Sequence, residues 1–230
     1  MTVSLAIQNT YDAIELALFK DATLLDVIRA DKTHASKQII PLLSSLLTKN
    51  NITFNQIQYL AVNQGPGPFT TLRVIIATVN GLSFAAHIPL IGIDGMHALL
   101  AQYKNETAVA TIALLDAFNK DIYFAIQKGN TLITSGYKKS DLLIQELTES
   151  YRHKEILLVG NAAQLYQDEL IQSLGDTIII NEDAQTCSIE QIGIMAYAKW
   201  QQQEGLTYQL FPLYLKQQQY KNQQGQIKTI

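Results

Sequence analysis

Short apolar runs separated by turn-forming residues open the chain. Residues 3–7 and 13–19 are apolar, and residues 8–12 between them include Asn9, Thr10 and Asp12. Strand-length apolar runs on either side of such a turn predict a β-hairpin. A third strand is expected at residues 24–30.

The next ninety residues combine helical and strand periods. Apolar residues recur at helical spacing through residues 36–49, and Asn50 and Asn51 follow as a stop signal. Strands are expected at 57–62 and 88–93, a stiff loop at 65–68, and a nearly all-apolar helix at 70–86. A helix with so little polar surface must be covered on most sides, by its own sheet and, we expect, by a second protein.

The second half has a similar pattern. It predicts strands at 109–115, 122–127 and 155–159 and helices at 142–150 and 189–202, whereas Gln dominates after residue 215. Alternating helices and strands favour a layered α/β fold. We expect an N-terminal lobe at 1–104, which carries the partner-binding helices, a C-terminal lobe at 105–216 and a flexible tail at 217–230.

Composition narrows the functional classes. The chain has 230 residues, of which 16% are charged, and a formal net charge of -3. It has no long Lys/Arg run, so tight unaided binding to a polyanion is not expected. A single cysteine excludes an intramolecular disulfide. We see neither a signal peptide nor an apolar run of 18 residues, and therefore expect a cytoplasmic protein without a membrane role.

The most distinctive motif spans residues 63–73, Asn-Gln-Gly-Pro-Gly-Pro-Phe-Thr-Thr-Leu-Arg. Gly65 and Gly67 permit unusual backbone angles, the prolines stiffen the turn, and Thr70 or Thr71 could cap the following helix. Such a loop presents a helix N-terminus and could hold a nucleotide or anion at Gly65, Gly67 and Thr70. The alternative is a plain strand-to-helix turn. The Lys and Ser/Thr of a P-loop are missing, which argues against a Walker-type site.

Residues 65–73 resemble the GPGSFTGLR hallmark of the TsaB (YeaZ) family. Further similarity covers residues 34–41, the Asp-Ala and Ile-Tyr pairs at 116–117 and 122–123, and Pro-Leu-Tyr-Leu-Lys at 212–216. The resemblance is strongest over residues 34–95 and sparse between 130 and 210.

This resemblance implies an actin-like ATPase (ASKHA) fold, in which a mixed β-sheet with flanking helices is duplicated to form two lobes. It also implies a non-catalytic scaffold subunit of the complex that makes threonylcarbamoyladenosine beside the tRNA anticodon. The implied partners are the catalytic paralogue TsaD and the ATPase TsaE, with tRNA contacted only indirectly.

Two departures from the related enzymes argue against catalysis by this chain. Gln8 stands where catalytic members of the superfamily carry an Asp, and an amide cannot supply the carboxylate that magnesium favours. His34 is followed four residues later by Gln38, whereas TsaD-like enzymes place a second metal-binding histidine there. We expect no metal and no intrinsic cofactor, with ATP or ADP bound only in the assembled complex. The alternatives are a kinase-like phosphotransferase of the same fold and a TsaD-like catalytic subunit.

The partner surface is expected on the two N-terminal helices, and the same surface could form a homodimer. The expected interface residues are His34, Gln38, Ile39, Leu42, Leu43, Leu46, Phe69, Leu72, Arg73, Ile76 and Asn80.

Two further residues have simple structural interpretations. Asp116 ends a predicted strand and is interpreted as a turn residue. Cys187 has no basic neighbour in sequence and is interpreted as a structural thiol.

Overall fold

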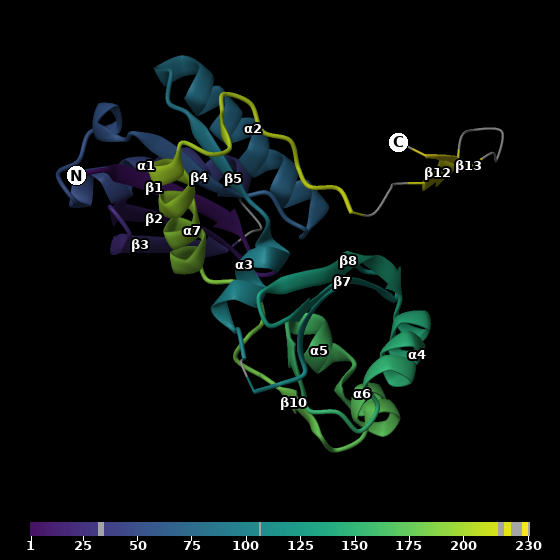
Figure 1. The fold of residues 1–230 in the computed structure, drawn as a ribbon. Helices are drawn as coiled ribbons and strands as arrows, with labels where there is room; N and C mark the ends of the chain where they lie inside the picture. The colour runs from purple at the N-terminus through teal and green to yellow at the C-terminus, as the bar shows by residue number, and fades with distance from the viewer. Residues whose placement is uncertain (32–34, 106, 216–218, 222–226, 230) are drawn as a thin grey trace.

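A computed structural model describes the chain except for residues 32–34, 106, 216–218, 222–226 and 230. Two lobes, each built around one mixed sheet, lie one above the other in Figure 1. The first sheet has the order β11-β5-β4-β1-β2-β3 and the second the order β10-β9-β6-β7-β8. The predicted α/β class is confirmed.

The bounds of the elements are as follows. The first sheet contains β1 (Val3–Asn9), β2 (Ala13–Lys20), β3 (Thr23–Asp31), β4 (Tyr59–Asn63), β5 (Leu90–Ile93) and β11 (Leu206–Thr207). The second contains β6 (Ala110–Asp116), β7 (Asp121–Lys128), β8 (Thr131–Lys139), β9 (Ile156–Val159) and β10 (Ile178–Ile180). The helices are α1 (Ala35–Lys49), the short 3-10 turn η2 (Phe54–Gln56), α2 (Phe69–Ala86), α3 (Gly95–Gln102), α4 (Ser140–Tyr151), α5 (Asn161–Leu165), α6 (Gln167–Leu174) and α7 (Ile189–Gln202).

Both sheets share one topology. In the first, β1, β2 and β3 form an antiparallel meander, and β4 runs parallel to β1 on its other side. In the second, β6, β7 and β8 repeat that meander and β9 runs parallel to β6. The expected duplication of a mixed sheet is therefore present.

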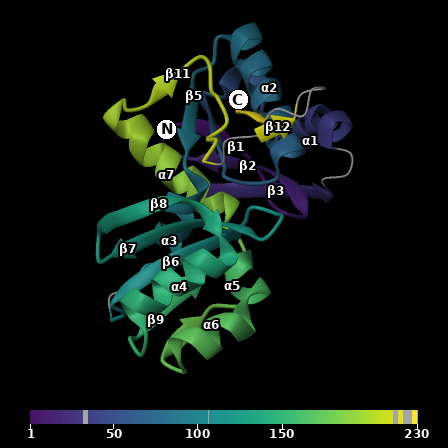
Figure 2. The ribbon, with the colours of Figure 1, turned by 90° about the vertical axis from the view of Figure 1, so that its right-hand side faces the viewer.

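Helices cover both faces of the first sheet, with α1 and α2 on one face and α7 on the other (Figures 1 and 2). Alternate strand residues divide between these layers: Leu5 and Ile7 pack toward α1 and α2, and Ala6 toward α7. Burial of both faces explains why the strands read as continuous apolar runs. A separate core lies under α4, α5 and α6 in the second lobe.

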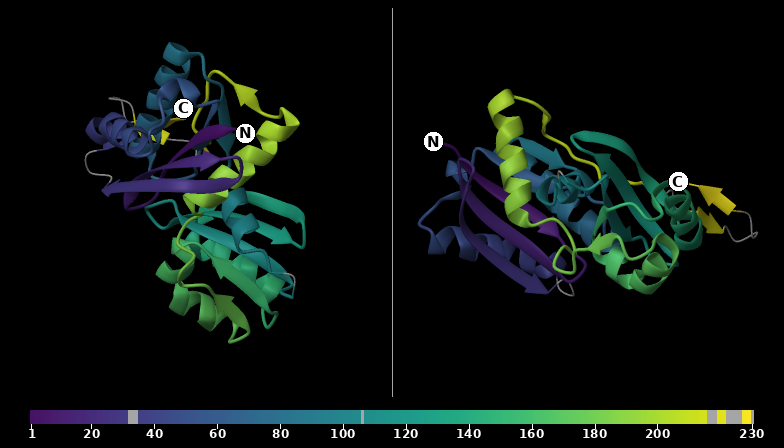
Figure 3. Two further views of the ribbon diagram at one scale, coloured as in Figure 1. Left: turned by 90° about the vertical axis from the view of Figure 1, so that its left-hand side faces the viewer. Right: turned by 60° about the horizontal axis from the view of Figure 1, so that its bottom comes forward.

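The chain returns to the first lobe after residue 188, which corrects the expected C-terminal lobe of 105–216. Helix α7 packs against β1, β2, β4 and β5, and β11 pairs with β5. Gly193 permits this close approach, because a Cβ there would lie 2.2 Å from the Phe19 ring. Trp200 at the other end of α7 stacks on Tyr59 with centroids 4.9 Å apart. Figure 3 shows α7 lying along the first sheet.

Several elements were not expected. They include the edge strand β8, the short helices α5 and α6, and the three-residue strand β10. Most side chains of β8 are exposed, so the strand carries no apolar run to indicate it. Helices of five and eight residues span too few turns for a clear period.

Part of the expected tail lies outside the described residues, as does His34. Within the tail, β12 (Gln219–Lys221) and β13 (Ile227–Thr229) form a two-stranded antiparallel ladder.

Helix α2 has 18 residues and a mean hydropathy of 1.4, which makes it long and apolar enough to cross a membrane by length and composition. Polar residues such as Thr70, Arg73 and Asn80 interrupt the helix, so it is not a continuous apolar run. A helix packed on its own sheet can meet the same criterion, and α2 is packed in this way, with Leu72, Ile75, Ile76, Val79 and Ser83 buried.

Candidate functional site

Gln8 lies at the end of β1 with 1% of its surface exposed. Its Nε2 donates to Glu15 Oε2 at 2.7 Å and to the Cys187 carbonyl oxygen at 3.3 Å, and its Oε1 accepts from Asn63 Nδ2 at 3.2 Å. The amide is therefore fully used by protein partners. Among the described residues, no three His, Cys, Asp or Glu side chains gather where they could hold a metal ion.

Cys187 packs against this amide network, with its Sγ 3.8 Å from Gln8 Oε1. Burial, with a smaller effect of Glu15, raises the pKa of the Cys187 thiol to about 12. The thiol therefore stays protonated at neutral pH and is a poor nucleophile. The interpretation of Cys187 as a structural residue agrees with this position.

Tyr11 connects the two lobes. Its hydroxyl donates to the Asp116 carbonyl oxygen at 2.6 Å, and its ring lies 6.2 Å from that of Phe118. Asp116 also donates its amide to Asn161 Oδ1 and accepts from the Phe118 amide. Asp116 thus lies in a hydrogen-bonded turn, in agreement with its interpretation from sequence.

A polar groove of about 590 Å³ flanks this contact. It is lined by residues from both lobes, including Glu15, Arg29, Asn161 and Asp183. Arg29 Nε and Glu15 Oε1 lie 3.6 Å apart on the neighbouring strands β3 and β2.

The loop before α2 is held rigidly. Gly65 has a φ of 100°, its amide donates to Asn63 Oδ1, and its carbonyl oxygen accepts from the Gly95 amide. A Cβ at Gly65 would lie 2.9 Å from Leu72, so both φ and space select glycine there. A Cβ at Gly67 would lie 3.5 Å from Asn9 Nδ2, a buried donor without a partner.

Neither threonine caps α2, which corrects the expected role of Thr70 and Thr71. The helix begins one residue earlier, at Phe69, and its N-cap is Pro68, which offers no side-chain acceptor. Thr70 is exposed on the first turn. No side chain of the described residues caps the amides of the first turn, which make no helical hydrogen bond.

The expected partner-interface residues divide into two groups. Five of them are buried against their own sheet and cannot contact a partner in this conformation: Ile39, Leu43, Leu46, Leu72 and Ile76. Gln38, Leu42, Phe69 and Asn80 are half-buried and Arg73 is exposed. The correction has a simple cause, because the largest apolar side chains of an amphipathic helix face its own core.

The outer face of α1 and α2 carries other residues. Ala77, Gly81 and Ala85 are exposed at intervals of four along α2, and nothing lies within 4 Å of the place that a Gly81 Cβ would occupy. Phe84 beside them is 82% exposed, and Ile40 on α1 is 51% exposed. We call these five residues the outer helical face.

A segment near the C-terminus is hydrogen-bonded along α2. Asn80 donates from Nδ2 to the Leu210 carbonyl oxygen and accepts the Leu210 amide at Oδ1, each at 2.9 Å. Gln64 donates to the Phe211 carbonyl oxygen, and the Leu213 amide donates to the Gln64 carbonyl oxygen. Asn80, which the sequence analysis assigns to the partner interface, therefore holds this chain's own backbone.

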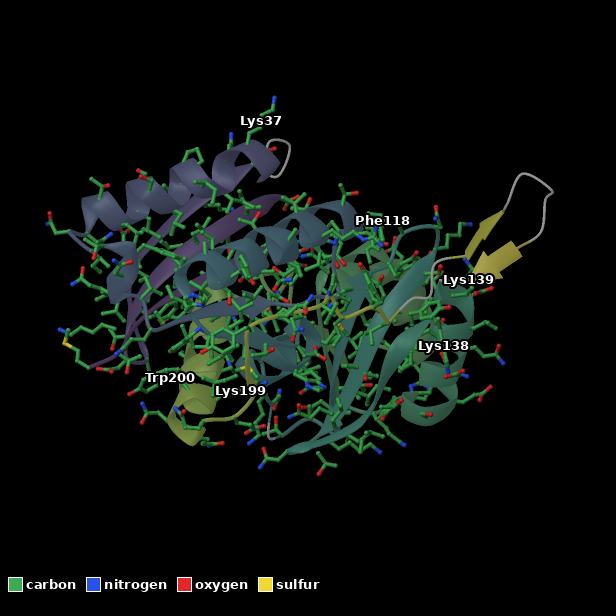
Figure 4. All side chains as sticks on the ribbon, turned by 90° about the horizontal axis from the view of Figure 1, so that it is seen from above. Lys37, Phe118, Lys138, Lys139, Lys199 and Trp200 are labelled. Carbon is green, nitrogen blue, oxygen red and sulfur yellow. The ribbon has the colours of Figure 1, made fainter. Side chains whose placement is uncertain are left out.

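This segment brings Tyr214 to the start of α2. Arg73 lies with its Cζ 3.7 Å from the centroid of the Phe69 ring and 5.6 Å from that of Tyr214, and its Nε donates to the Tyr214 hydroxyl at 2.9 Å. Phe69 and Tyr214 line a cavity of about 730 Å³ between the lobes, which also contacts Gly67, Phe118 and Lys139. Phe118 and Lys139, both labelled in Figure 4, lie at this end of the second lobe. The hallmark loop and the C-terminal motif thus meet at one place.

Comparison with known proteins agrees with the fold. The chain is similar to YeaZ from Pseudomonas aeruginosa, with a TM-score of 0.72, 23% identity and coverage of 94% of this chain and 100% of that one. It also resembles a Bacteroides thetaiotaomicron protein described as having an actin-like ATPase fold, with a TM-score of 0.52, 9% identity and coverage of 84% and 95%. The actin-like fold is therefore shown.

Sequence comparison places the chain within a family. It is 26% identical over 169 residues to the tRNA threonylcarbamoyladenosine biosynthesis protein TsaB of Escherichia coli, covering 71% of this chain and 73% of that protein. A family model described as "TsaD: tRNA N6-adenosine threonylcarbamoyltransferase" matches residues 28–222. The chain therefore belongs to the TsaD family of tRNA N6-adenosine threonylcarbamoyltransferases and, within it, to the TsaB (YeaZ) group.

Proposed function

We propose that this chain is a subunit of the machinery that makes threonylcarbamoyladenosine in tRNA, and that it supports a catalytic TsaD partner without performing the chemistry itself. Its similarity to proteins named for this biosynthesis supports the pathway. The supporting role would be a linkage effect, in which binding stabilises or orients the catalytic subunit.

The observation that carries the non-catalytic assignment is the buried amide of Gln8. Its donor and acceptor atoms are satisfied by Glu15, Cys187 and Asn63. A kinase-like phosphotransferase would need a carboxylate to anchor its metal at such a site, and an amide bonded on every side offers none. This argues against the phosphotransferase alternative.

The outer helical face is the surface that fits the partner. A row of small residues lets a second helix approach closely, and the exposed Phe84 ring can fill a pocket on that helix. A paralogue of the same fold would present a similar pair of helices, so the surface could also pair with a second copy of this chain. We place TsaE and tRNA in the assembled cytoplasmic complex, with tRNA contacting this chain only indirectly.

The test uses charge and bulk on this face. Gly81→Arg and Phe84→Asp should each abolish the complex with TsaD from the same cell, measured by size-exclusion chromatography with light scattering. Both positions are exposed, so circular dichroism should remain unchanged. Leu165→Asp, at a site on α5 that is 60% exposed, is the matched control and should leave the complex intact.

The same samples test the role. Threonylcarbamoyl transfer to tRNA should require this chain, be lost with Gly81→Arg, and be accompanied by no ATPase activity of the isolated chain. A complex that survives both substitutions would place the partner elsewhere. Phosphotransfer by the isolated chain would overturn the non-catalytic assignment.

A further inference from the structure

A cavity of about 350 Å³ lies between α4 and the strands β7 and β8. All of its lining residues belong to these three elements of the second lobe. The opposite face of the same sheet carries Ala113, Leu115 and Ala125, which pack in the core shared with the first lobe. The cavity is therefore on the far side of the second sheet from the first lobe, and its volume is at the lower end of the range for small-molecule sites.

The floor of this cavity is apolar. It is formed by the buried side chains of Phe124, Ile126, Leu143 and Leu147. Ile133 also lines the cavity, with a side chain that is 51% exposed. Ile133 is the extra residue of a β-bulge, because the register of β7 and β8 shifts between Ile126 and Gln127. Bulges redirect side chains and are common beside functional sites.

The internal duplication of the sheets explains the hollow. Strands β2 and β3 have the same lengths as β7 and β8 and shift register at the same place. Gly136, which pairs with Phe124, therefore corresponds to Ile28 of the first sheet. Ile28 packs against the core under α1, whereas glycine leaves that volume empty. A Cβ at Gly136 would lie 3.5 Å from Phe124 Cε1, an ordinary contact, and the φ of Gly136 is not positive, so the backbone does not require glycine here.

The charged residues of the lining lie toward opposite ends of β7. Near its start, Lys138 Nζ donates to Glu146 Oε1 at 2.6 Å, so these two charges neutralise each other. At its end, Lys128 Nζ lies 5.5 Å from the centroid of the Tyr151 ring. In the part of the chain that the structure describes, no carboxylate forms an ion pair with Lys128. Lys128 is therefore the uncompensated charge of the cavity.

The groups around Lys128 leave its charge to a ligand. Lys154 Nζ lies 5.8 Å from the same Tyr151 ring, but it donates to the Ser150 carbonyl oxygen at 2.7 Å and so compensates the negative end of the α4 dipole. Thr134 and Ser150, which also line the cavity, carry hydroxyls that can donate to an anion. A cation and two hydroxyls beside an apolar floor recognise a ligand that has an anionic end and an apolar body.

We propose that this cavity binds a small carboxylate with an apolar body, such as a medium-chain or arylalkyl acid. The carboxylate binds Lys128, and the apolar body occupies the space that Ile28 fills in the first lobe. Charge complementarity favours a carboxylate over a neutral apolar ligand, and the volume of the cavity favours a small molecule over a folded partner. The proposal concerns binding alone and does not rest on the proposed function.

The test begins with calorimetric titration of the full-length protein with octanoate, which should bind with a Kd of about 1 mM or tighter. Octanol and acetate should each bind at least about fivefold more weakly, because octanol lacks the charge and acetate lacks the apolar body. Raising the salt concentration should weaken the binding of octanoate, because salt screens the attraction between the carboxylate and Lys128.

Matched variants locate the site. Lys128→Ala should weaken octanoate binding about fivefold, because it removes the charge that holds the carboxylate. Lys20→Ala makes the same charge change at the corresponding end of β2, outside the cavity, and should leave binding unchanged. Gly136→Val fills the hollow and should weaken the binding of octanoate at least about tenfold. Valine favours strands and its Cβ would meet an ordinary contact, so this variant should remain folded.

Several outcomes would overturn the proposal. Octanoate could fail to bind at about 10 mM, octanol could bind as tightly as octanoate, or Lys20→Ala could weaken binding as much as Lys128→Ala. Full binding by Gly136→Val, with the fold verified by circular dichroism, would place the ligand elsewhere. If Gly136→Val does not fold, the comparison of the two lysine variants decides.

Discussion

Gln8, Asn63 and Cys187 form a buried polar cluster where β1 and β4 meet the segment before α7. A polar cluster at this depth is tolerated because its members satisfy one another. An unpaired carboxylate at position 8 would instead be a buried charge beside Glu15. The Gln8 amide therefore stabilises the buried cluster without placing a second charge beside Glu15.

The reactivity of the Cys187 thiol measures how readily solvent reaches this cluster. The native thiol should react with a disulfide reagent at pH 8 far more slowly than the thiol of the protein in guanidinium chloride, because burial keeps it protonated. Prompt labelling of the native protein would show that the cluster opens readily.

The same thiol predicts a pH dependence. The folded pKa of about 12 is above the unfolded value of about 8.5, so the folded state binds more protons and the stability contribution is complete below pH 8.5. It is lost as pH rises from about 8.5 toward 12, at up to about 1.4 kcal/mol per unit. Urea unfolding across that range should show the fall, and Cys187→Ala should lack it.

Residue roles that depend on distant partners were not predictable. Asn80 holds the backbone of Leu210, and Gln64 that of Phe211 and Leu213, across more than a hundred positions of sequence. An Asn within an apolar helix indicates that its side chain needs a hydrogen-bond partner, but it does not show which residue provides one. The presence of Gln8 and the lack of a metal-anchoring carboxylate there, by contrast, could be read directly.

At the scale of elements, α1 and α2 each bury one side and leave the other exposed. The inner face packs on the first sheet, and the outer face exposes Ile40 and Phe84. The apolar period located both helices to within one residue at their starts, but five of the residues that it assigned to a partner are buried against the first sheet. The reason is that a periodic pattern identifies apolar positions without stating which of them the chain itself covers.

A pair of substitutions on α1 separates the two faces. Leu43→Ala should lower the free energy of unfolding by about 2–5 kcal/mol, because it leaves a cavity in the core. Ile40→Ala, three residues away and exposed, should change it by about 0.5 kcal/mol or less. Urea denaturation measures both. Similar losses for the two variants would mean that the exposed face is packed in solution by a second copy.

At the scale of the whole molecule, the lobes share a core as well as polar contacts. Ala113, Leu115 and Val159 from the second sheet pack in one cluster with Phe19 and Met96. Tyr11 adds a hydrogen bond across the seam, and burial together with Asp116 raises the pKa of Tyr11 far above its usual range. Its hydroxyl is therefore a donor throughout the working pH range.

Removing that hydroxyl tests the contact between lobes. Tyr11→Phe should leave the Asp116 carbonyl oxygen without this donor, at a cost of about 1 kcal/mol. Hydrogen exchange in the turn at 117–121 should accelerate about fivefold, because 1 kcal/mol corresponds to that ratio. Tyr137→Phe, on the exposed strand β8, is the control. Equal exchange in both variants would show that the shared core alone holds the lobes.

The sequence by itself determined the α/β class, the duplicated halves, the helices α1, α2 and α7, and the hallmark loop, because each depends on local period or on turn chemistry. Only the tertiary structure decided that α7 and β11 return to the first lobe, which apolar face of α1 and α2 stays exposed, and that Arg73 meets Tyr214. These features depend on contacts between residues far apart in the chain. No local pattern specifies them, because the type of a side chain does not reveal which distant residue it will contact.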